Sequence, residues 1–329
     1  MKTPPPPPSF GATPANGAAQ ASVRYLDLLS RAAAHVDANL DAALDADLLA
    51  RQAAMSRHHF HRVFHAYFGL TVGGYVTWRR LRRACELLAA RRSAPVLEAA
   101  QAVGFESAQA LAKAMRRELG TTPTAVRAGD APAWAHFFAQ RRISDDAGAA
   151  TDAEAAIRPL QPRWVQAPAL DALTATGHGM TQGTMTRAAQ QAFGELWPAL
   201  LSRDLASKVT HTIATMPEEP QGPEDADCRI LVGALFGHSL PDGQGKPAMP
   251  YVALDGSLAW WHLPAGRYAV FTHVGAYTGL HTVWKAIYRH WLPATGYATR
   301  DVPGFDLYLD DPRSTPEAAL RTHLYLPLQ

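Results

Sequence analysis

The chain has 329 residues, of which 47% are apolar and 18% charged, and its net charge is +2. This composition is sufficient to build a packed core and excludes wholesale disorder, while the length favours about two domains. The sequence contains no run of 18 apolar residues, which excludes a membrane-spanning helix.

The N-terminus and the cysteines indicate the compartment. Five prolines, Pro4 to Pro8, follow the first three residues, and no apolar core of a signal peptide is present. We therefore expect a cytoplasmic protein. The two cysteines, Cys85 and Cys228, lie far apart and belong to no CxxC pair. This spacing disfavours a disulfide framework and a cysteine-rich metal site.

Charge is distributed unevenly along the chain. Residues 51–127 hold 13 Lys and Arg against 4 Asp and Glu, whereas residues 150–329 hold 13 against 17. A basic segment joined to an acidic remainder predicts a module that binds a polyanion, followed by a domain of another kind. The alternative is a chance cluster of solvated arginines.

The sequence pattern divides the chain into four segments. In order, these are a flexible tail rich in Pro, Ala and Gly, a helical domain, a linker and an α+β domain: 1–21, 22–128, 129–157 and 158–329. Within the linker we expect a short helix around Trp134–Arg141. In the last segment, short β-type runs alternate with helical stretches near Thr186–Arg203 and Gly279–Leu292.

The helical domain contains an internal repeat at an offset of 51 residues. The matched positions are Ser56 with Ser107, Phe60 with Leu111, Phe64 with Met115, and Gly69 with Gly120. The apolar positions recur at i, i+4 and i+8, which is one face of a helix. Each serine is placed to cap the start of its helix, and each glycine permits the positive φ that ends it.

A short apolar helix and a tight turn precede each repeat, at Leu48–Ala53 and Val96–Ala102. This order predicts two helix-turn-helix units, joined by an arginine-rich helix over Tyr75–Ala90. The alternative is a pair of ordinary helical hairpins. The positive charge and the exposed arginine and histidine side chains favour DNA, because arginine can bind guanine edges or phosphate. Two linked reading helices can enter adjacent major grooves as a monomer.

A set of residues in 22–128 carries a specific family resemblance. They are Leu48-Leu49-Ala50, Ser56 to Phe64, Gly69, Tyr75-Val76, Arg79 to Ala84, Ala99, Gly104 to Ser107, Gly120 to Pro123, and Arg127. With these residues the segment resembles the DNA-binding domain of the AraC/XylS family. The resemblance implies double-stranded DNA as a partner and RNA polymerase as a further one.

The same resemblance implies which residues meet DNA. In the first unit they are Ser56, Arg57, His58, His61 and Arg62, with the last three reading bases. In the second unit they are Ser107, Ala108, Gln109, Ala112, Lys113, Arg116 and Arg117. Of these, Ala108, Gln109, Ala112 and Lys113 stand at the base-reading positions, and the alternatives for this unit are contact with thymine methyl groups and contact mainly with the DNA backbone. Because the alanines offer no side-chain hydrogen bonds, we expect the first unit to dominate specificity.

The last segment also repeats itself. Leu173–Leu200 is similar to Tyr268–Ala294, and a hairpin-like pair of β-type runs follows each stretch. Two β-α-β-β repeats side by side would leave a central groove between them. Aromatic residues are abundant in this region, and the alternative to a pocket is that they simply form core.

Several stretches after Leu258 carry a second resemblance. They are Leu263 to Phe271, His273 to Leu280, Trp284, Trp291 to Pro293, Gly296-Tyr297, Phe305 to Tyr308, Asp310 to Pro312 and Leu324 to Pro327. With them residues 158–329 resemble the GyrI-like effector-binding domain, whose groove binds hydrophobic, often cationic small molecules. Asp306 stands where the family usually has glutamate.

A carboxylate among aromatic rings suits organic cations. The candidate effector-binding residues are Trp164, Trp197, Tyr277, Trp284, Phe305, Asp306 and Tyr308. The alternatives are a solvated or capping role for Asp306 and plain helix packing for Tyr277 and Trp284.

The sequence lacks a Walker A loop, an HExxH pair and a GxSxG elbow. We therefore expect no catalytic residue, metal or cofactor, although His58 and His61 at i, i+3 could share a metal. The sequence predicts a transcription regulator with an all-α domain followed by an α+β domain. One alternative is a hydrolase or toxin scavenger that uses the groove, with DNA binding secondary. Another is a regulator whose vestigial groove responds to protein partners.

Overall fold

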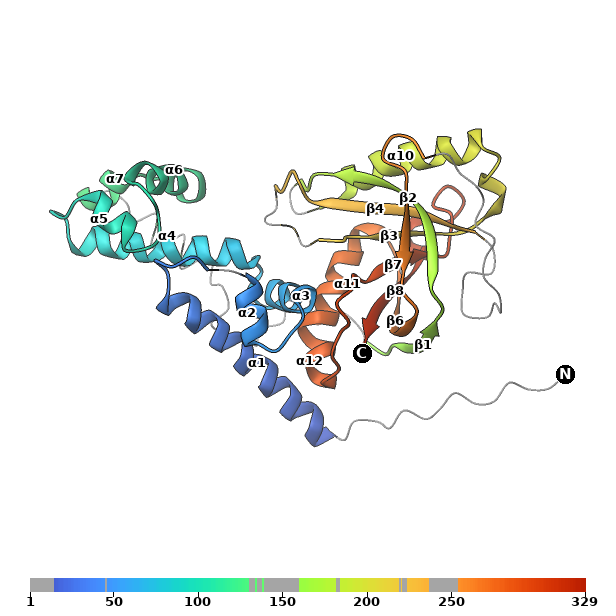
Figure 1. Ribbon diagram of the computed structural model, residues 1–329, viewed down its shortest axis with the longest axis horizontal. Coiled ribbons are helices and arrows are strands. Elements are labelled where there is room, and N and C mark those ends of the chain that lie inside the picture. The colour runs from blue at the N-terminus through green and yellow to red at the C-terminus, as the bar shows by residue number, and fades with distance from the viewer. Residues whose placement is uncertain are drawn as a thin grey trace.

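The computed structural model of the chain describes residues 15–44, 46–129, 134, 138, 160–181, 184–218, 220, 224–236 and 254–329. It consists of a helical domain and a β-sheet domain that lie against each other (Figure 1). The prediction of an all-α domain followed by an α+β domain is therefore confirmed. The two cysteines, Cys85 and Cys228, are buried in different domains.

Seven helices form the helical domain between residues 15 and 129. They are α1 (Ala15–Ala38), α2 (Ala46–Gln52), α3 (Arg57–Phe68), α4 (Val72–Ala90), α5 (Val96–Gln101), α6 (Ala108–Leu119) and α7 (Pro123–Ala128). Helices α2 and α3 form the first helix-turn-helix unit, α5 and α6 form the second, and α4 connects them (Figure 1). No helix in the described ranges is long and apolar enough to cross a membrane.

Helix α1 begins inside the segment 1–21 that we expected to be a tail. It starts at Ala15, and residues 15–21 include four alanines, which have the highest intrinsic helix propensity. The low-complexity composition therefore indicated too late a start for the helical domain. Residues 1–14 lie outside the described part of the chain.

The predicted caps of both reading helices are present. The hydroxyls of Ser56 and Ser107 each accept the backbone N–H of the third residue after them, at 3.3 and 3.1 Å. Gly69 and Gly120 end the helices with φ of 66° and 63°, values that only glycine adopts at little cost. Capping thus defines α3 and α6 at both ends, as the repeat predicted.

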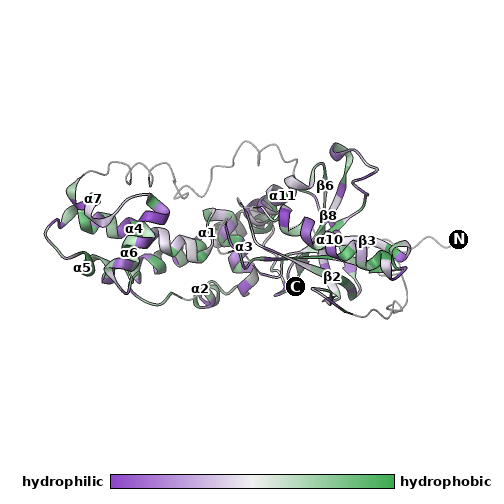
Figure 2. Ribbon diagram, turned by 90° about the horizontal axis from the view of Figure 1, so that it is seen from above, coloured by the Kyte–Doolittle hydropathy of each residue, from purple (hydrophilic) through white to green (hydrophobic). Residues whose placement is uncertain are grey.

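The connecting helix α4 buries one face and exposes the other. Its buried residues include Leu81, Ala84, Cys85 and Leu88, which recur at helical spacing. Figure 2 shows the matching alternation of hydrophobic and hydrophilic residues on this helix, as expected when one face is buried. Of the linker, Trp134 and Phe138 are described and helical, and Phe138 packs edge-on against Trp78. The rest of 130–157 lies outside the described residues.

One antiparallel sheet of eight strands forms the second domain. The strands are β1 (Arg163–Ala167), β2 (Leu170–His178), β3 (Val209–Thr215), β4 (Arg229–Phe236), β5 (Ala259–Leu263), β6 (Gly266–Val274), β7 (Phe305–Tyr308) and β8 (Arg321–Leu328). Their order is β1-β6-β8-β7-β3-β4-β2-β5. The two predicted β-α-β-β repeats are therefore β2 to β4 and β6 to β8, and they meet where β3 pairs with β7.

The helices of both repeats cover the same face of the sheet. They are α10 (Thr186–Ser202) in the first repeat and α11 (Leu280–Ala286), a π-helical turn η3 (Ile287–Trp291) and α12 (Leu292–Thr295) in the second. The described residues of this domain also form three 3₁₀ turns: η1 (Ala206–Lys208), η2 (Tyr277–Gly279) and η4 (Glu317–Ala319). The two repeats meet at the paired strands β3 and β7, which is where the sequence predicted a groove.

The helical domain contacts the sheet domain through α1 and α3. Helix α1 packs against α12, and α3 packs against η3 (Figure 1). Buried residues of the two domains form one continuous apolar cluster, which includes Leu29 and Phe64 on one side and Ile287 and Leu292 on the other. The predicted DNA-reading helix α3 therefore lies at the domain interface.

Candidate functional sites

The second reading helix, α6, presents a polar face to solvent. Its four polar candidates are exposed: Gln109, Lys113, Arg116 and Arg117. Ala108 and Ala112 are partly buried, and Ser107 uses its hydroxyl as the helix cap. Figure 1 shows α6 far from the sheet domain. The predicted contacts of the second unit are thus accessible to DNA in this structure.

The first reading helix, α3, is placed differently. Arg57 is exposed and pairs with Asp47 at 3.2 Å, but His61 is only 8% exposed and Arg62 is partly buried. The side chain of His58 lies outside what the structure describes. Of the predicted base readers in this unit, the two described side chains are therefore turned away from bulk solvent.

His59, which is not among the predicted DNA contacts, joins α3 to the sheet domain. Its Nδ1 accepts hydrogen bonds from the hydroxyl of Thr299 at 2.6 Å and from the backbone N–H of the same residue at 3.3 Å. The neutral ring then carries its proton on Nε2, which donates to the hydroxyl of Tyr25 at 3.0 Å. That hydroxyl donates to the carbonyl of Tyr297 at 3.1 Å. Burial lowers the pKa of His59 to about 4, which keeps the ring neutral.

Arg62 extends from α3 to the groove of the sheet domain. Its Nη2 donates to the carbonyl of Met216, just after β3, at 3.2 Å. The guanidinium carbon lies 5.9 Å from the ring centre of Trp284 and 5.7 Å from that of Tyr288. These are cation–π distances, so a planar cation from the DNA-reading helix lies on two aromatic side chains of the other domain.

Asp306 lies on the helix-covered face of the sheet, where the sequence predicted a groove, and the strand register explains why. It pairs with Ala214 of β3 and with Leu324 of β8, whose side chains belong to the apolar clusters on the helix-covered face. Directly paired residues point to the same face, so Asp306 lies beneath the helices. Its Oδ1 accepts the indole N–H of Trp284 at 2.8 Å.

The carboxyl of Asp306 is electrostatically perturbed. Burial raises its pKa to about 7, while the hydrogen bond from Trp284 and the positive charge of Arg62 act in the opposite direction. The ordinary value is 3.8, so this group changes charge near neutral pH. A buried carboxyl of this kind is stabilised in its charged form when a cation approaches it.

Tyrosine and phenylalanine rings form the next part of the groove. Tyr308, two residues after Asp306 on the same face, lies 4.8 Å from Tyr277 and 6.4 Å from Phe193 of α10, measured between ring centres. Burial and the neighbouring Asp306 raise the pKa of Tyr308 well above its usual value. The hydroxyl of Tyr277 donates to the carbonyl of Asp310 at 3.3 Å. These tyrosines are therefore neutral at physiological pH.

The structure brings together four of the seven candidate effector residues: Tyr277, Trp284, Asp306 and Tyr308. Trp197 lies on α10 beside this cluster, with the guanidinium carbon of Arg313 5.4 Å from its ring centre.

Two candidates lie elsewhere. Phe305 points to the opposite face of the sheet because side chains alternate along a strand, and it stacks on Tyr325 at 4.5 Å. Trp164 packs on Tyr297 at 5.0 Å and on Trp291 at 6.1 Å, at the end near α12. Neither side chain is part of the Asp306 cluster.

Sequence reasoning did not select Phe193, Met216 or Tyr288 for this site. Phe193 and Tyr288 are unremarkable members of amphipathic helices, and Met216 contributes only a backbone carbonyl. Gly304 is a further contributor, because a Cβ at that position would lie 2.7 Å from Trp284 Cη2. Because Gly304 has no side chain, the indole of Trp284 can pack directly on the backbone just before β7.

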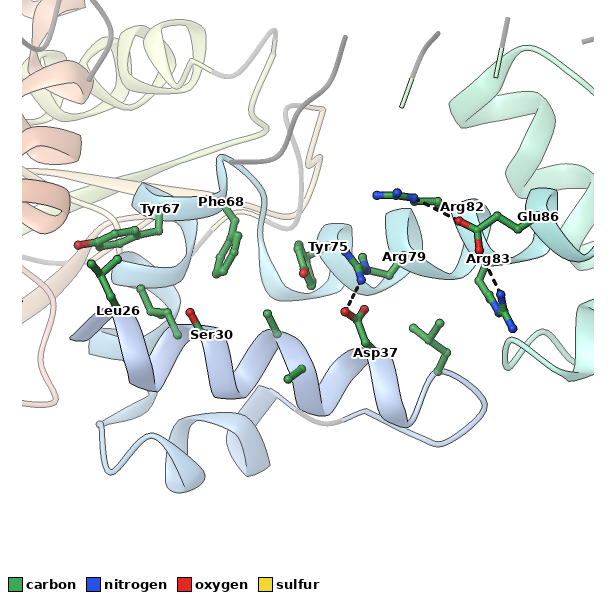
Figure 3. Close-up of a pocket in the computed structure, with 14 residues that line it drawn as sticks. Leu26, Ser30, Asp37, Tyr67, Phe68, Tyr75, Arg79, Arg82, Arg83 and Glu86 are labelled. Carbon is green, nitrogen blue, oxygen red and sulfur yellow. Dashed lines mark hydrogen bonds and ion pairs between the residues drawn. The ribbon is translucent and has the colours of Figure 1, made fainter. Parts of the chain in front are cut away.

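A separate cavity of about 530 Å³ lies in the helical domain (Figure 3). Helices α1 and α4 provide most of its lining, including Leu26, Tyr75 and the ion pair between Arg79 and Asp37. It contains none of the residues predicted for DNA or for the effector. This cavity and the Asp306 groove are therefore distinct features.

The fold and these sites define a protein that joins a tandem helix-turn-helix domain to a small-molecule-binding domain. Residues 161–329, half of the chain, match the GyrI-like small molecule binding domain family, and the chain belongs to this family. Residues 49–129 match a helix-turn-helix domain family. Both resemblances found in the sequence are confirmed.

Similar proteins carry regulatory names. The chain is 45% identical over 67 residues to the probable transcriptional regulator YgiV of Escherichia coli strain K12, a match that covers 20% of this chain and 41% of YgiV. It is 29% identical over 92 residues to the probable transcription factor PqrA of Proteus vulgaris, which covers 28% of this chain and 75% of PqrA. The chain thus spans less than half the length of YgiV.

Solved structures resemble each domain separately. An AraC-type transcriptional regulator from Chromobacterium violaceum covers 32% of this chain and 95% of its own, with 29% identity and a TM-score of 0.31. A hydrolase from Listeria innocua covers 54% of this chain and 96% of its own, with 16% identity and a TM-score of 0.33. At these scores neither likeness bears on function.

Proposed function

We propose that this chain is a DNA-binding transcription regulator that responds to a small hydrophobic or cationic effector in the Asp306 groove. Both reading helices have the capped geometry of helix-turn-helix units, and α6 exposes a row of hydrogen-bonding and basic side chains. The proposed place of action is the cytoplasm, and contact with RNA polymerase is part of the same proposal.

The contact made by Arg62 carries the effector half of the proposal. A guanidinium already lies on Trp284 and Tyr288, and its charge acts on the carboxyl of Asp306. The cluster therefore has the three features that an organic cation requires: aromatic faces, a carbonyl acceptor at Met216 and the partly buried acid Asp306. This observation supports a cationic effector over a neutral one.

The test has two parts and uses the full chain. Selection from random duplex DNA, followed by fluorescence anisotropy, should yield a preferred sequence that binds more tightly than scrambled DNA. A thermal-shift screen of lipophilic cations and neutral analogues should show stabilisation by cations that Asp306→Asn reduces. Absence of any sequence preference would contradict the DNA assignment, and equal effects of cations and neutral compounds would contradict the effector assignment.

A second candidate function follows from the pKa of Asp306. A carboxyl that titrates near 7 can act as a general acid or base, which favours a hydrolase that acts on compounds in the groove. Mass spectrometry of ligands recovered from the screen separates the two functions. Unaltered ligand supports the regulator, whereas converted ligand that depends on Asp306 supports the enzyme.

A further inference from the structure

Helix α3, the proposed DNA-reading helix of the first unit, contacts the proposed effector site of the sheet domain. His59 is 4% exposed and His61 8% exposed, and Arg62 reaches into the groove of the sheet domain. A duplex cannot reach the guanidinium of Arg62 while it lies on the sheet domain, and the side chain of His61 is buried in the same arrangement. In this arrangement α6 is accessible to DNA while the described base readers of α3 are not.

Arg62 occupies the position that a cationic ligand requires. Its guanidinium lies on Trp284 and Tyr288, donates to the carbonyl of Met216 and acts electrostatically on Asp306. A ligand with a guanidinium or ammonium group would use the same rings, carbonyl and carboxyl. Two cations cannot occupy one such site together, because they would overlap and repel each other.

We propose that a cationic effector displaces Arg62 from the Asp306 groove and thereby releases α3 to read DNA. This inference rests on the proposed function and adds its regulation: effector and Arg62 are mutually exclusive, and the effector increases sequence-specific DNA binding. In the closed state the chain presents one reading helix, α6. In the open state it presents two.

The domains can separate as two folded units, because the bonds between them are side-chain contacts and no strand in the described residues pairs across the interface. Water can replace the hydrogen bonds of His59 to Thr299 and of Tyr25 to the carbonyl of Tyr297, and Tyr67 lies near the charge of Arg289. The apolar packing of α1 on α12 separates in the same step. A closed state that excludes the ligand lowers the apparent ligand affinity by the fraction of open molecules. Removing the guanidinium of Arg62 should therefore tighten ligand binding.

Phenylguanidinium is the probe, because it carries the same planar cation as Arg62 on an aromatic ring. Phenylurea is its neutral analogue of nearly the same shape. Isothermal titration calorimetry with the full chain should give at least tenfold tighter binding of phenylguanidinium to Arg62→Met than to the unsubstituted chain. Arg31→Met is the matched control, since Arg31 is an exposed arginine of α1 paired with Asp27, and it should leave the affinity unchanged.

Domain release is measured independently of any change at Arg62. Spin labels are placed at Ala90→Cys on α4 and Ser202→Cys on α10, both exposed and outside the proposed sites. Electron–electron double resonance should show a shifted or broadened distance distribution when phenylguanidinium is added, and no change with phenylurea. This arm tests the proposal even where Arg62→Met folds poorly.

The outcomes separate the inference from the proposed function. Equal affinity of phenylguanidinium for both arginine variants and the unsubstituted chain, with an unchanged distance distribution, would overturn mutual exclusion while leaving a cation-binding groove. Binding to none of the three proteins would overturn the cationic effector itself. Tighter binding to Arg62→Met, together with a ligand-induced distance change, would support the displacement.

Discussion

His59 and Thr299 lie 240 residues apart in the chain, yet the hydroxyl of Thr299 donates to His59 Nδ1 at 2.6 Å. This buried hydrogen bond connects α3, the proposed DNA-reading helix of the first unit, to the sheet domain. Its acceptor exists only while the imidazole is neutral, because a doubly protonated ring has no lone pair to offer. The domain interface therefore contains a group whose protonation opposes docking.

Acidification should weaken this interface through His59. Its pKa is about 4 in the folded chain and about 6.5 when exposed, so the unfolded chain binds the proton more readily. The stabilising contribution is complete above pH 6.5 and is lost as pH falls through 4. Urea unfolding at several pH values should show the difference in unfolding free energy between the unsubstituted chain and His59→Phe shrinking over this window, by up to about 3 kcal/mol.

The control for this pH effect lies on the same helix. His65 is an exposed residue of α3, and His65→Phe is the matched variant, since it removes an imidazole from the same helix and leaves the contacts of His59 in place. A His59→Phe difference that stays constant from pH 7.5 to 4 would show that the buried imidazole does not govern the pH response.

Cation binding should depend on pH through Asp306. The carboxyl has a pKa of about 7 without ligand, so it is about half neutral at neutral pH, and a bound cation stabilises the charged form. Affinity for phenylguanidinium should therefore rise as pH increases from 6 to 8, with proton release detectable by calorimetry in buffers of different ionisation enthalpy. Asp306→Asn should bind more weakly and lose the pH dependence, whereas the neutral phenylurea should show none in either protein.

The same group makes an unfavourable contribution to stability at high pH. Between pH 4 and 7 the folded chain holds a proton that the unfolded chain has released, so the unfolding free energy falls as pH rises through this window. Asp306→Asn removes the effect and should be the more stable protein at pH 8, by up to roughly 4 kcal/mol. If Asp306→Asn were less stable at pH 8, the hydrogen bond from Trp284 and the charge of Arg62 would outweigh the cost of burying the charged carboxyl.

The hydrogen bond from Trp284 lowers the pKa of Asp306. Its indole N–H donates to Asp306 at 2.8 Å and favours the charged carboxyl, and Trp284→Phe retains a ring while removing this donor. Because a hydrogen bond to a charged group contributes about 1.5–3 kcal/mol, the pKa of Asp306 should rise by about one to two units. The midpoint of the pH dependence of phenylguanidinium binding should shift upward accordingly. Trp164→Phe is the matched control, since Trp164 packs on Tyr297 and Trp291 away from the Asp306 cluster, and it should leave the midpoint in place.

The sequence predicted the helices and strands well, because their ends depend on local backbone geometry. Ser56, Gly69, Ser107 and Gly120 are capping residues whose roles depend on local backbone geometry, and these were confirmed. Phe305 shows the limit of proximity in sequence: it adjoins Asp306 but points to the other face, because a one-residue step along a strand reverses the side chain.

The contact of Arg62 with the groove could not be inferred from either domain resemblance. Each resemblance describes one domain and carries no information on how two domains dock. The docking depends on pairs such as His59 with Thr299 and Arg62 with Trp284, which belong to segments far apart in the chain. An arginine that can bind the edge of guanine can equally bind the Asp306 site. At either place the guanidinium finds hydrogen-bond acceptors and an aromatic ring on which to stack.

DNA binding should separate the roles of the two reading helices. With phenylguanidinium present at saturation, so that α3 is released, Arg62→Ala should weaken binding to the selected sequence by about 1–3 kcal/mol and relax specificity at the base it reads. Lys113→Ala, on the exposed face of α6, should weaken binding to selected and scrambled DNA alike and reduce the salt slope by about one ion, as expected for a phosphate contact. Fluorescence anisotropy titrations over a range of salt concentrations measure both effects. If Arg62→Ala instead changed only the salt slope, Arg62 would be a phosphate contact, and base reading by the first unit would have to come from other residues of α3.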